Sequence, residues 1–163
     1  MPLSTDEFLE DGSVTVRFEA VEKYGRDARP LEMTVETRAL VPPELTVSDM
    51  GIDDDDQDNS FGNSNGKIEK GETIEVRAIV QNKGQGDAEA VTVELTPAQG
   101  VFFVGKQTFN LGDLSPGTWR EINFAFTVPP TYSGSNDLPF KLKIGEARKR
   151  YGAEETLSLA LNR

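Results

Sequence analysis

Apolar and polar residues alternate with a period of two along most of this chain. In TIEVRAIVQN, residues 73–82, the apolar side chains of Ile74, Val76, Ala78 and Val80 fall on one side and polar ones on the other. Because successive side chains of a β-strand point to opposite faces, this pattern predicts strands with one buried face. The alternation recurs in VTVEL (91–95), EINFAFTV (121–128), LPFKLKI (138–144) and TLSLALN (156–162).

Turn-forming segments separate the predicted strands: NKGQGDA (82–88), LSPGT (114–118) and TYSGSND (131–137). They leave room for hairpins but not for crossover helices. The sequence therefore predicts an all-β, immunoglobulin-like antiparallel β-sandwich of about seven strands, within a domain at 42–163. Its core is expected to include Val76, Val80, Val93, Leu95, Phe124, Phe126, Leu142 and Leu159.

Residues 1–41 are predicted to contain an extra N-terminal β-hairpin. The stretch EAVEKYG (19–25) matches EARKRYG (146–152), and each lies between two alternating segments. We interpret residues 1–41 as the remnant of a preceding repeat, with a chance match as the alternative. A lone hairpin is marginal in water, so its apolar face should pack on the main domain or on a second copy, as a homodimer. That face comprises Val14, Val16, Phe18, Leu31, Met33 and Val35.

Composition excludes several classes of function. The chain has no His and no Cys, which removes the usual nucleophile and base pairs and the usual zinc sites. Asp and Glu outnumber Lys and Arg by 28 to 17, so nucleic acid is not an expected partner. The longest apolar run, VFFV (101–104), is far too short to span a membrane. The sequence thus predicts a protein that is not an enzyme and that does not insert into membranes.

Three stretches occur in a telling order: PPELTVSDMGI (42–52), GNSNGKIEKGETIEVRAIVQNKGQGDAEAVTVEL (62–95) and LGDLSPGTWREINFAFTVP (111–129). They carry a P-x-L-x-V opening, a V-x-N-x-G-x-G-x-A-x-x-V hairpin and an L-x-P-G turn. In this order they resemble the bacterial CARDB and NEW3-type immunoglobulin-like modules, over residues 44–163. The resemblance implies a seven-stranded sandwich of a large extracellular or cell-envelope protein, used in adhesion, spacing or presentation. It implies no ligand, and MPLSTDEFLEDG (1–12) lacks a signal-peptide pattern, so any export signal is expected outside this chain.

The stretch DDDDQDNSFGNSNGKIEKGE, residues 53–72, is the candidate binding site. An EF-hand-type calcium loop supplies oxygen ligands from alternating positions, with a Gly at the turn and a bidentate Glu six residues later. Gly66 and Glu72 have this spacing, although Phe61 occupies the first ligand position and no helices flank the loop. The predicted calcium ligands are Asp54, Asp56, Asp58, Asn63, Asn65, Lys67 through its carbonyl, Glu69 and Glu72. A plain solvated loop and a basic protein partner are the alternatives.

The sequence as a whole favours a non-enzymatic structural or adhesion-type module, one of several in tandem in a larger bacterial protein. Such a module spaces or presents neighbouring domains and could also contact another protein or a glycan. A carbohydrate-binding module is the alternative, and it would need exposed aromatic side chains on one sheet face. Trp119 is instead expected to pack at a strand start, and the basic cluster at 148–150 to form a solvated turn.

Overall fold

The computed structural model describes residues 8–162, and the chain divides into two compact units, Met1–Val41 and Pro42–Arg163. The predicted all-β fold class is confirmed, because the described residues form ten strands and one short 3-10 helix at Lys149–Tyr151. Within residues 8–162, no helix has the length and apolar character needed to cross a membrane.

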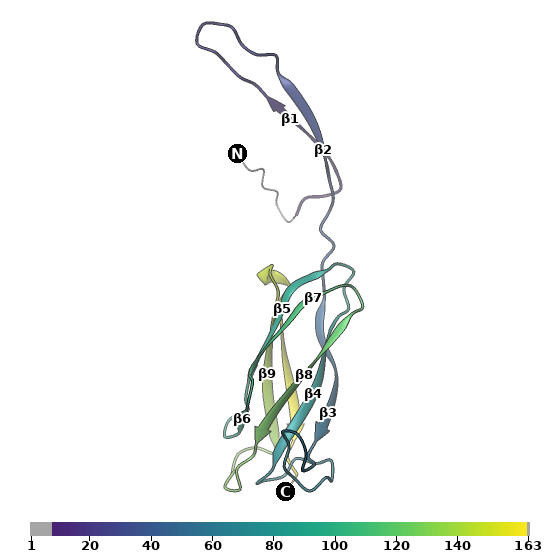
Figure 1. Ribbon diagram of the computed structural model, residues 1–163, viewed down its shortest axis with the longest axis vertical. Coiled ribbons are helices and arrows are strands. Elements are labelled where there is room, and N and C mark those ends of the chain that lie inside the picture. Colours follow the sequence, from purple (N-terminus) through teal and green to yellow (C-terminus); the bar gives the residue numbers. More distant parts are fainter. Residues whose placement is uncertain (1–7, 163) are drawn as a thin grey trace. The chain divides into compact units, whose positions relative to one another are not determined.

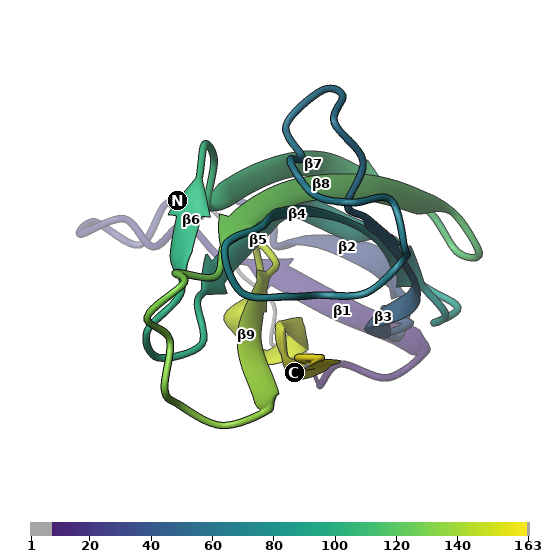
Figure 2. The same cartoon turned by 90° about the horizontal axis from the view of Figure 1, so that it is seen from below.

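The second unit is a sandwich of two four-stranded antiparallel sheets (Figures 1 and 2). The first sheet has the order β3-β4-β8-β6, formed by Leu45–Asp53, Thr73–Asn82, Trp119–Thr127 and Phe102–Val104. The second has the order β10-β9-β5-β7, formed by Ala153–Ala160, Asp137–Gly145, Ala88–Thr96 and Thr108–Leu114. These eight strands agree with the immunoglobulin-like sandwich that the alternation predicted.

The facing sides of the two sheets form one apolar core. All eight predicted core residues are buried, from Val76 in β4 to Leu159 in β10. Phe140 of β9 lies at the centre, with its ring centroid 4.6 Å from that of Phe126 and 5.8 Å from that of Phe124. Because Phe124 and Phe126 belong to β8, these ring contacts join the two sheets across the core.

The chain enters and leaves the sandwich at opposite ends. Leu45, at the start of β3, pairs with Asn82, whereas the end of β3 lies beside the start of β4. We call the Leu45 end the proximal end. β10 runs away from it and finishes at Ala160, paired with Asp137, at what we call the distal end. Figure 2 looks onto the distal end, where the connection between β3 and β4 crosses.

The first unit contains the predicted hairpin. β1 (Gly12–Phe18) pairs with β2 (Leu31–Thr37) in antiparallel register, so that Val14 faces Val35, Val16 faces Met33 and Phe18 faces Leu31. The six predicted apolar residues therefore share one face. All but Val16 are exposed to solvent, and Val16 is half-buried.

The seven-residue match between the two units does not correspond to a common register. When EAVEKYG is laid on EARKRYG, apolar Phe18 falls on Gly145 and apolar Val16 on the exposed Lys143. A shift of one residue in a strand moves every side chain to the other face, so the two apolar faces are out of phase. The interpretation of residues 1–41 as a repeat remnant stays a prediction, and the seven-residue match no longer supports it.

The exposed hairpin face predicts self-association of the intact chain. We expect sedimentation to give the full chain a mass about twice the 17.9 kDa of one copy, and to show residues 42–163 alone as a monomer. Met33→Glu should return the full chain to the monomer, because it places a charge in the apolar face, and Glu36→Gln on the same strand should not. An intact chain that sediments as a monomer in analytical ultracentrifugation at high micromolar concentration would contradict the homodimer.

Candidate functional site

Asp54 anchors the long connection between β3 and β4. Its buried carboxylate accepts backbone N–H bonds from Asn65 and Gly66, each at 2.9 Å, and its carbonyl accepts one from Ser64 at 3.1 Å. Gly66 has a φ of 73°, a left-handed conformation that favours glycine. A Cβ at Gly62 would collide with the Asp54 carbonyl oxygen. The connection is therefore folded tightly around Asp54.

Glu69 ties the same connection to the C-terminal end of the sandwich. Its carboxylate accepts side-chain amide bonds from Asn162 at 2.5 Å, Asn63 at 2.8 Å and Asn65 at 3.2 Å. These three bonds, in that order, lower the pKa of Glu69. The neighbouring residue, buried Ile68, accepts the backbone N–H of Asn162 at 2.8 Å. The point where the chain leaves the sandwich is thus fixed by the acidic loop.

Glu72 lies buried where the connection enters β4. Its Oε2 accepts the backbone N–H of Glu69 at 3.0 Å. Burial raises the pKa of Glu72, and the negative charges of Glu69 and Asp54 raise it further, against the lowering effect of the backbone hydrogen bonds. The ionised carboxylate is therefore disfavoured in the folded protein.

The structure brings together only part of the predicted calcium-ligand set. Asp54, Asn63, Asn65, Glu69 and Glu72 lie in one hydrogen-bonded loop. The remaining three are exposed: Asp56, Asp58 and Lys67, whose N–H donates to the Asn65 side-chain oxygen at 2.8 Å.

In this structure the carboxylates of the predicted ligand set do not gather around one point. Over residues 8–162, no three Asp or Glu side chains lie close enough together to hold a metal ion. The physical reason is that Asp54 faces backbone N–H groups, and that Asp55 instead closes a separate turn by accepting bonds from Gln57 and Ser60. Calcium binding itself stays a prediction.

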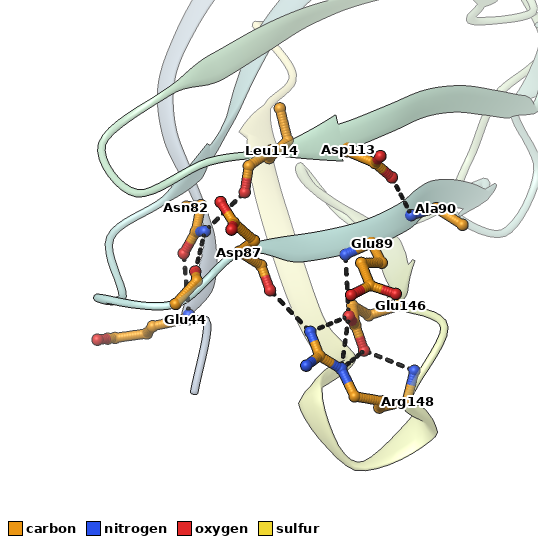
Figure 3. Close-up of polar contacts among 10 residues, drawn as sticks. Glu44, Asn82, Asp87, Glu89, Ala90, Asp113, Leu114, Glu146 and Arg148 are labelled. Atoms are coloured by element: carbon orange, nitrogen blue, oxygen red, sulfur yellow. Dashed lines mark hydrogen bonds and ion pairs between the residues drawn. The ribbon is translucent and has the colours of Figure 1, made fainter. Parts of the chain in front are cut away.

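At the proximal end, one fully buried side chain organises three segments (Figure 3). The amide nitrogen of Asn82 donates to the carbonyls of Gly86 and Leu114, both at 2.8 Å. Its oxygen accepts from the N–H groups of Glu44 at 3.1 Å and Gly84 at 3.0 Å. Two donors and two acceptors use the full hydrogen-bonding capacity of the amide. Sequence reasoning missed this role, although Asn82 continues the buried series Ile74 to Val80 and is the polar exception in it.

The incoming chain is held against the β4–β5 connection. Lys83 donates its N–H to the carbonyl of Glu44 at 2.7 Å, and Gly86 donates to that of Pro42 at 3.1 Å. Pro43 is buried, and any Cβ at Gly84 would collide with the backbone of Pro43 and Glu44. Residues 42–44 are therefore part of the sandwich and not a loose tether.

A buried ion pair closes the same end between β5 and β9 (Figure 3). The inaccessible carboxylate of Glu146 lies 2.7 Å from Nη2 of Arg148 and accepts N–H bonds from Glu89 at 2.9 Å and Arg148 at 2.6 Å. Burial alone would raise the pKa of Glu146, but the bonds from Arg148 and Glu89 outweigh it and leave that pKa lowered. Arg148 also donates to the Asp87 carbonyl at 2.7 Å. The prediction of a wholly solvated basic turn is therefore wrong for Arg148.

The position of Trp119 also differs from the prediction. Its side chain is 52% exposed rather than packed, because it begins β8 on the outer face, paired with Gln81. The inward positions of β8 are Ile122, Phe124 and Phe126. The alternation in EINFAFTV, continued backwards, already places residue 119 outward.

The two facing antiparallel sheets define an immunoglobulin-like β-sandwich module. A family model for CARDB matches residues 43–145, more than half of the chain, and the chain belongs to the CARDB family. CARDB domains are non-catalytic β-sandwich modules of larger proteins. The comparison with curated proteins finds no match. Among solved structures, a FixG-related protein from Vibrio parahaemolyticus is 15% identical over 71% of this chain and 96% of that one, with a TM-score of 0.41.

The Glu146–Arg148 pair predicts how the free energy of unfolding depends on pH. At pH 7, Glu146→Gln should reduce the free energy of unfolding by about 2 kcal/mol, because it leaves the Arg148 guanidinium without its counter-charge and makes the backbone bonds neutral ones. Since the folded-state pKa of Glu146 is lowered, its contribution is complete above the ordinary value of 4.5 and is lost as the pH falls through the folded-state pKa. Urea denaturation should show the wild-type advantage shrinking below pH 4.5. Glu94→Gln, on the exposed face of β5, should change little, and an advantage independent of pH would contradict the assignment.

Proposed function

We propose that this chain is a non-enzymatic, adhesion-type module that spaces or presents neighbouring domains of a larger bacterial protein, outside the cell or in its envelope. Membership of the CARDB family supports this, since its members are modules of larger proteins. The observation that carries the proposal is that the sandwich binds its own incoming and outgoing segments at opposite ends. Its direct partners are then the adjacent domains of the same polypeptide.

A spacer holds its neighbouring domains at a fixed separation only if its two chain ends are fixed to its body. At the proximal end, the N–H and carbonyl of Glu44 are bonded to Asn82 and Lys83. At the distal end, the N–H and side chain of Asn162 are bonded to Ile68 and Glu69. Between them β3 contributes nine residues, a span of about 30 Å. Two fixed attachment points at this separation suit a rigid element in a string of domains.

Distance measurement between the two ends tests the spacer function. The chain has no Cys, so Glu44→Cys with Ala160→Cys gives a clean spin-labelled pair for pulsed electron paramagnetic resonance. We expect one narrow distance distribution. Adding Asn82→Ala should broaden it and lower the free energy of unfolding by about 3 kcal/mol, because it leaves buried donors and acceptors unpaired. Gln81→Ala, one residue away on the outer face, is the matched control. A broad distribution in the otherwise native chain would remove the support for a rigid spacer.

The second part of the proposal is that calcium stiffens the loop at 53–72. The loop and the strand before it hold six acids and no base over residues 49–58. Burial raises the pKa of Glu72 most, and the nearby charges of Glu69 and Asp54 raise it further. A cation at this place would relieve that repulsion.

A calcium titration with Glu72→Gln tests the loop. Millimolar calcium should raise the melting temperature of the native chain. At a calcium concentration ten times the dissociation constant, binding adds about 1.4 kcal/mol to the free energy of unfolding. Glu72→Gln should abolish that response. Because the raised pKa means that ionised Glu72 opposes folding at pH 7, the same variant without calcium should be at least as stable as the native chain.

Asp53→Asn is the control for the titration. The Asp53 carboxylate accepts one backbone bond from Asp55 at 3.1 Å, which an Asn side-chain oxygen preserves. This variant should keep the calcium response. Calorimetry without calcium uptake at millimolar concentration, together with a melting curve indifferent to chelator, would leave residues 53–72 as a self-bonded loop.

A further inference from the structure

The distal end contains a cavity of about 730 Å³, within the size range of small-ligand sites. It lies between the β5–β6 connection, the start of β6 and the β8–β9 connection. Its walls include Gln99, Phe102, Thr131, Tyr132, Ser133 and Asp137. None of the residues proposed as calcium ligands lines it.

One wall of the cavity is preformed around Tyr132. The Tyr132 hydroxyl donates to the Ser135 carbonyl at 3.0 Å, and its ring is buried against two glycines. A Cβ at Gly134 would lie 2.5 Å from the Tyr132 hydroxyl oxygen, and one at Gly100 would lie 3.1 Å from the ring. Gly100 also has a φ of +85°, which disfavours any side chain. The ring is therefore set in place before any ligand arrives, which reduces the entropic cost of binding.

The chemistry of the cavity favours a hydroxyl-rich ligand without negative charge. It offers an amide from Gln99, hydroxyls from Thr131 and Ser133, and one carboxylate from Asp137, and its lining contains no Lys or Arg. An anion would find no counter-charge here, and a purely apolar ligand would leave these polar groups unpaired. The ring of Phe102, 64% exposed, supplies a flat apolar surface at the rim.

We propose that this cavity is a binding site for neutral oligosaccharides. Sugar rings combine apolar C–H faces, which stack on aromatic rings, with hydroxyl groups that pair with amides, hydroxyls and carboxylates. Phe102 provides the exposed ring, buried Tyr132 the fixed wall, and Gln99, Thr131 and Asp137 the hydrogen-bonding partners. The proposal does not depend on the spacer function, and it gives a place to the carbohydrate-binding alternative that the sequence left open.

A row of side chains extends the site across the outer face of the β3-β4-β8-β6 sheet. Phe102 pairs with Thr127, Thr127 with Thr73, and Thr73 forms an isolated bridge with Phe61. The two Thr hydroxyls are 2.9 Å apart, and the Phe61 ring is 62% exposed. Three strand spacings separate the two Phe residues, a distance of about 14 Å. A longer glycan leaving the cavity over Phe102 therefore meets hydroxyls and a second ring.

Calorimetry with defined oligosaccharides tests the site in the full chain. The neutral probes are the hexasaccharides of cellulose, chitin, laminarin and mannan, with hexagalacturonate as the acidic probe. We expect at least one neutral hexasaccharide to bind, and Phe102→Ala to weaken its binding at least about tenfold. Gln99→Ala should weaken it as well, which provides a second variant if Phe102→Ala disturbs folding. Trp119→Ala removes another exposed aromatic ring, at the proximal end, and should leave binding unchanged.

Comparing a long and a short oligosaccharide tests whether the row from Phe102 to Phe61 takes part in binding. Phe61→Ala should weaken binding of the hexasaccharide but not of the corresponding disaccharide, which is too short to reach it. No binding of any neutral probe, binding of hexagalacturonate alone, or equal losses in Phe102→Ala and Trp119→Ala would each overturn the proposal. An equal effect of Phe61→Ala on both probe lengths would overturn the extension across the sheet.

Discussion

The proximal end of this sandwich depends on one buried amide. The Asn82 side chain connects the incoming chain at Glu44, the β4–β5 turn at Gly84 and Gly86, and the end of β7 at Leu114. An apolar side chain there would leave buried backbone groups without partners. The amide also sets register, because its four bonds are satisfied only when the three segments meet at these residues. The buried amide thus fixes how these three segments are aligned at the edge of the apolar core.

At the distal end a carboxylate holds the chain in place. Glu69 gathers three amide side chains, including that of the outgoing Asn162, and these bonds stabilise its ionised form. Glu72, three residues later, is buried beside it in the opposite electrostatic situation, with a raised pKa. The loop therefore holds one favoured and one disfavoured carboxylate side by side. Amide hydrogen bonds lower the pKa of Glu69, whereas burial and the neighbouring negative charges raise that of Glu72.

The strands and the core could be predicted from the sequence because side-chain alternation is a local property of the backbone, and all eight expected core residues are buried. The loop could not, because Asp, Asn and Gly are suited both to coordinating a cation and to closing tight turns. Which of these Asp54 does depends on where the N–H groups of Asn65 and Gly66 point. The Glu146–Arg148 pair was equally hidden, since its hydrogen-bonding partner Glu89 comes from another strand.

The same amide side chains take part in the internal hydrogen bonds of the acidic loop and in the proposed calcium binding. Asn63 and Asn65 now turn their nitrogens toward Glu69, while calcium would need their oxygens. Rotation of the Asn63 amide by half a turn would convert a donor to Glu69 into a ligand. The same rotation of Asn65 would also break the bond that its oxygen accepts from the Lys67 N–H. Asn162 shares the Glu69 carboxylate, so calcium would compete with the bond that holds the outgoing chain. Calcium at this loop would then act on the attachment of the outgoing chain as well as on the stiffness of the loop itself.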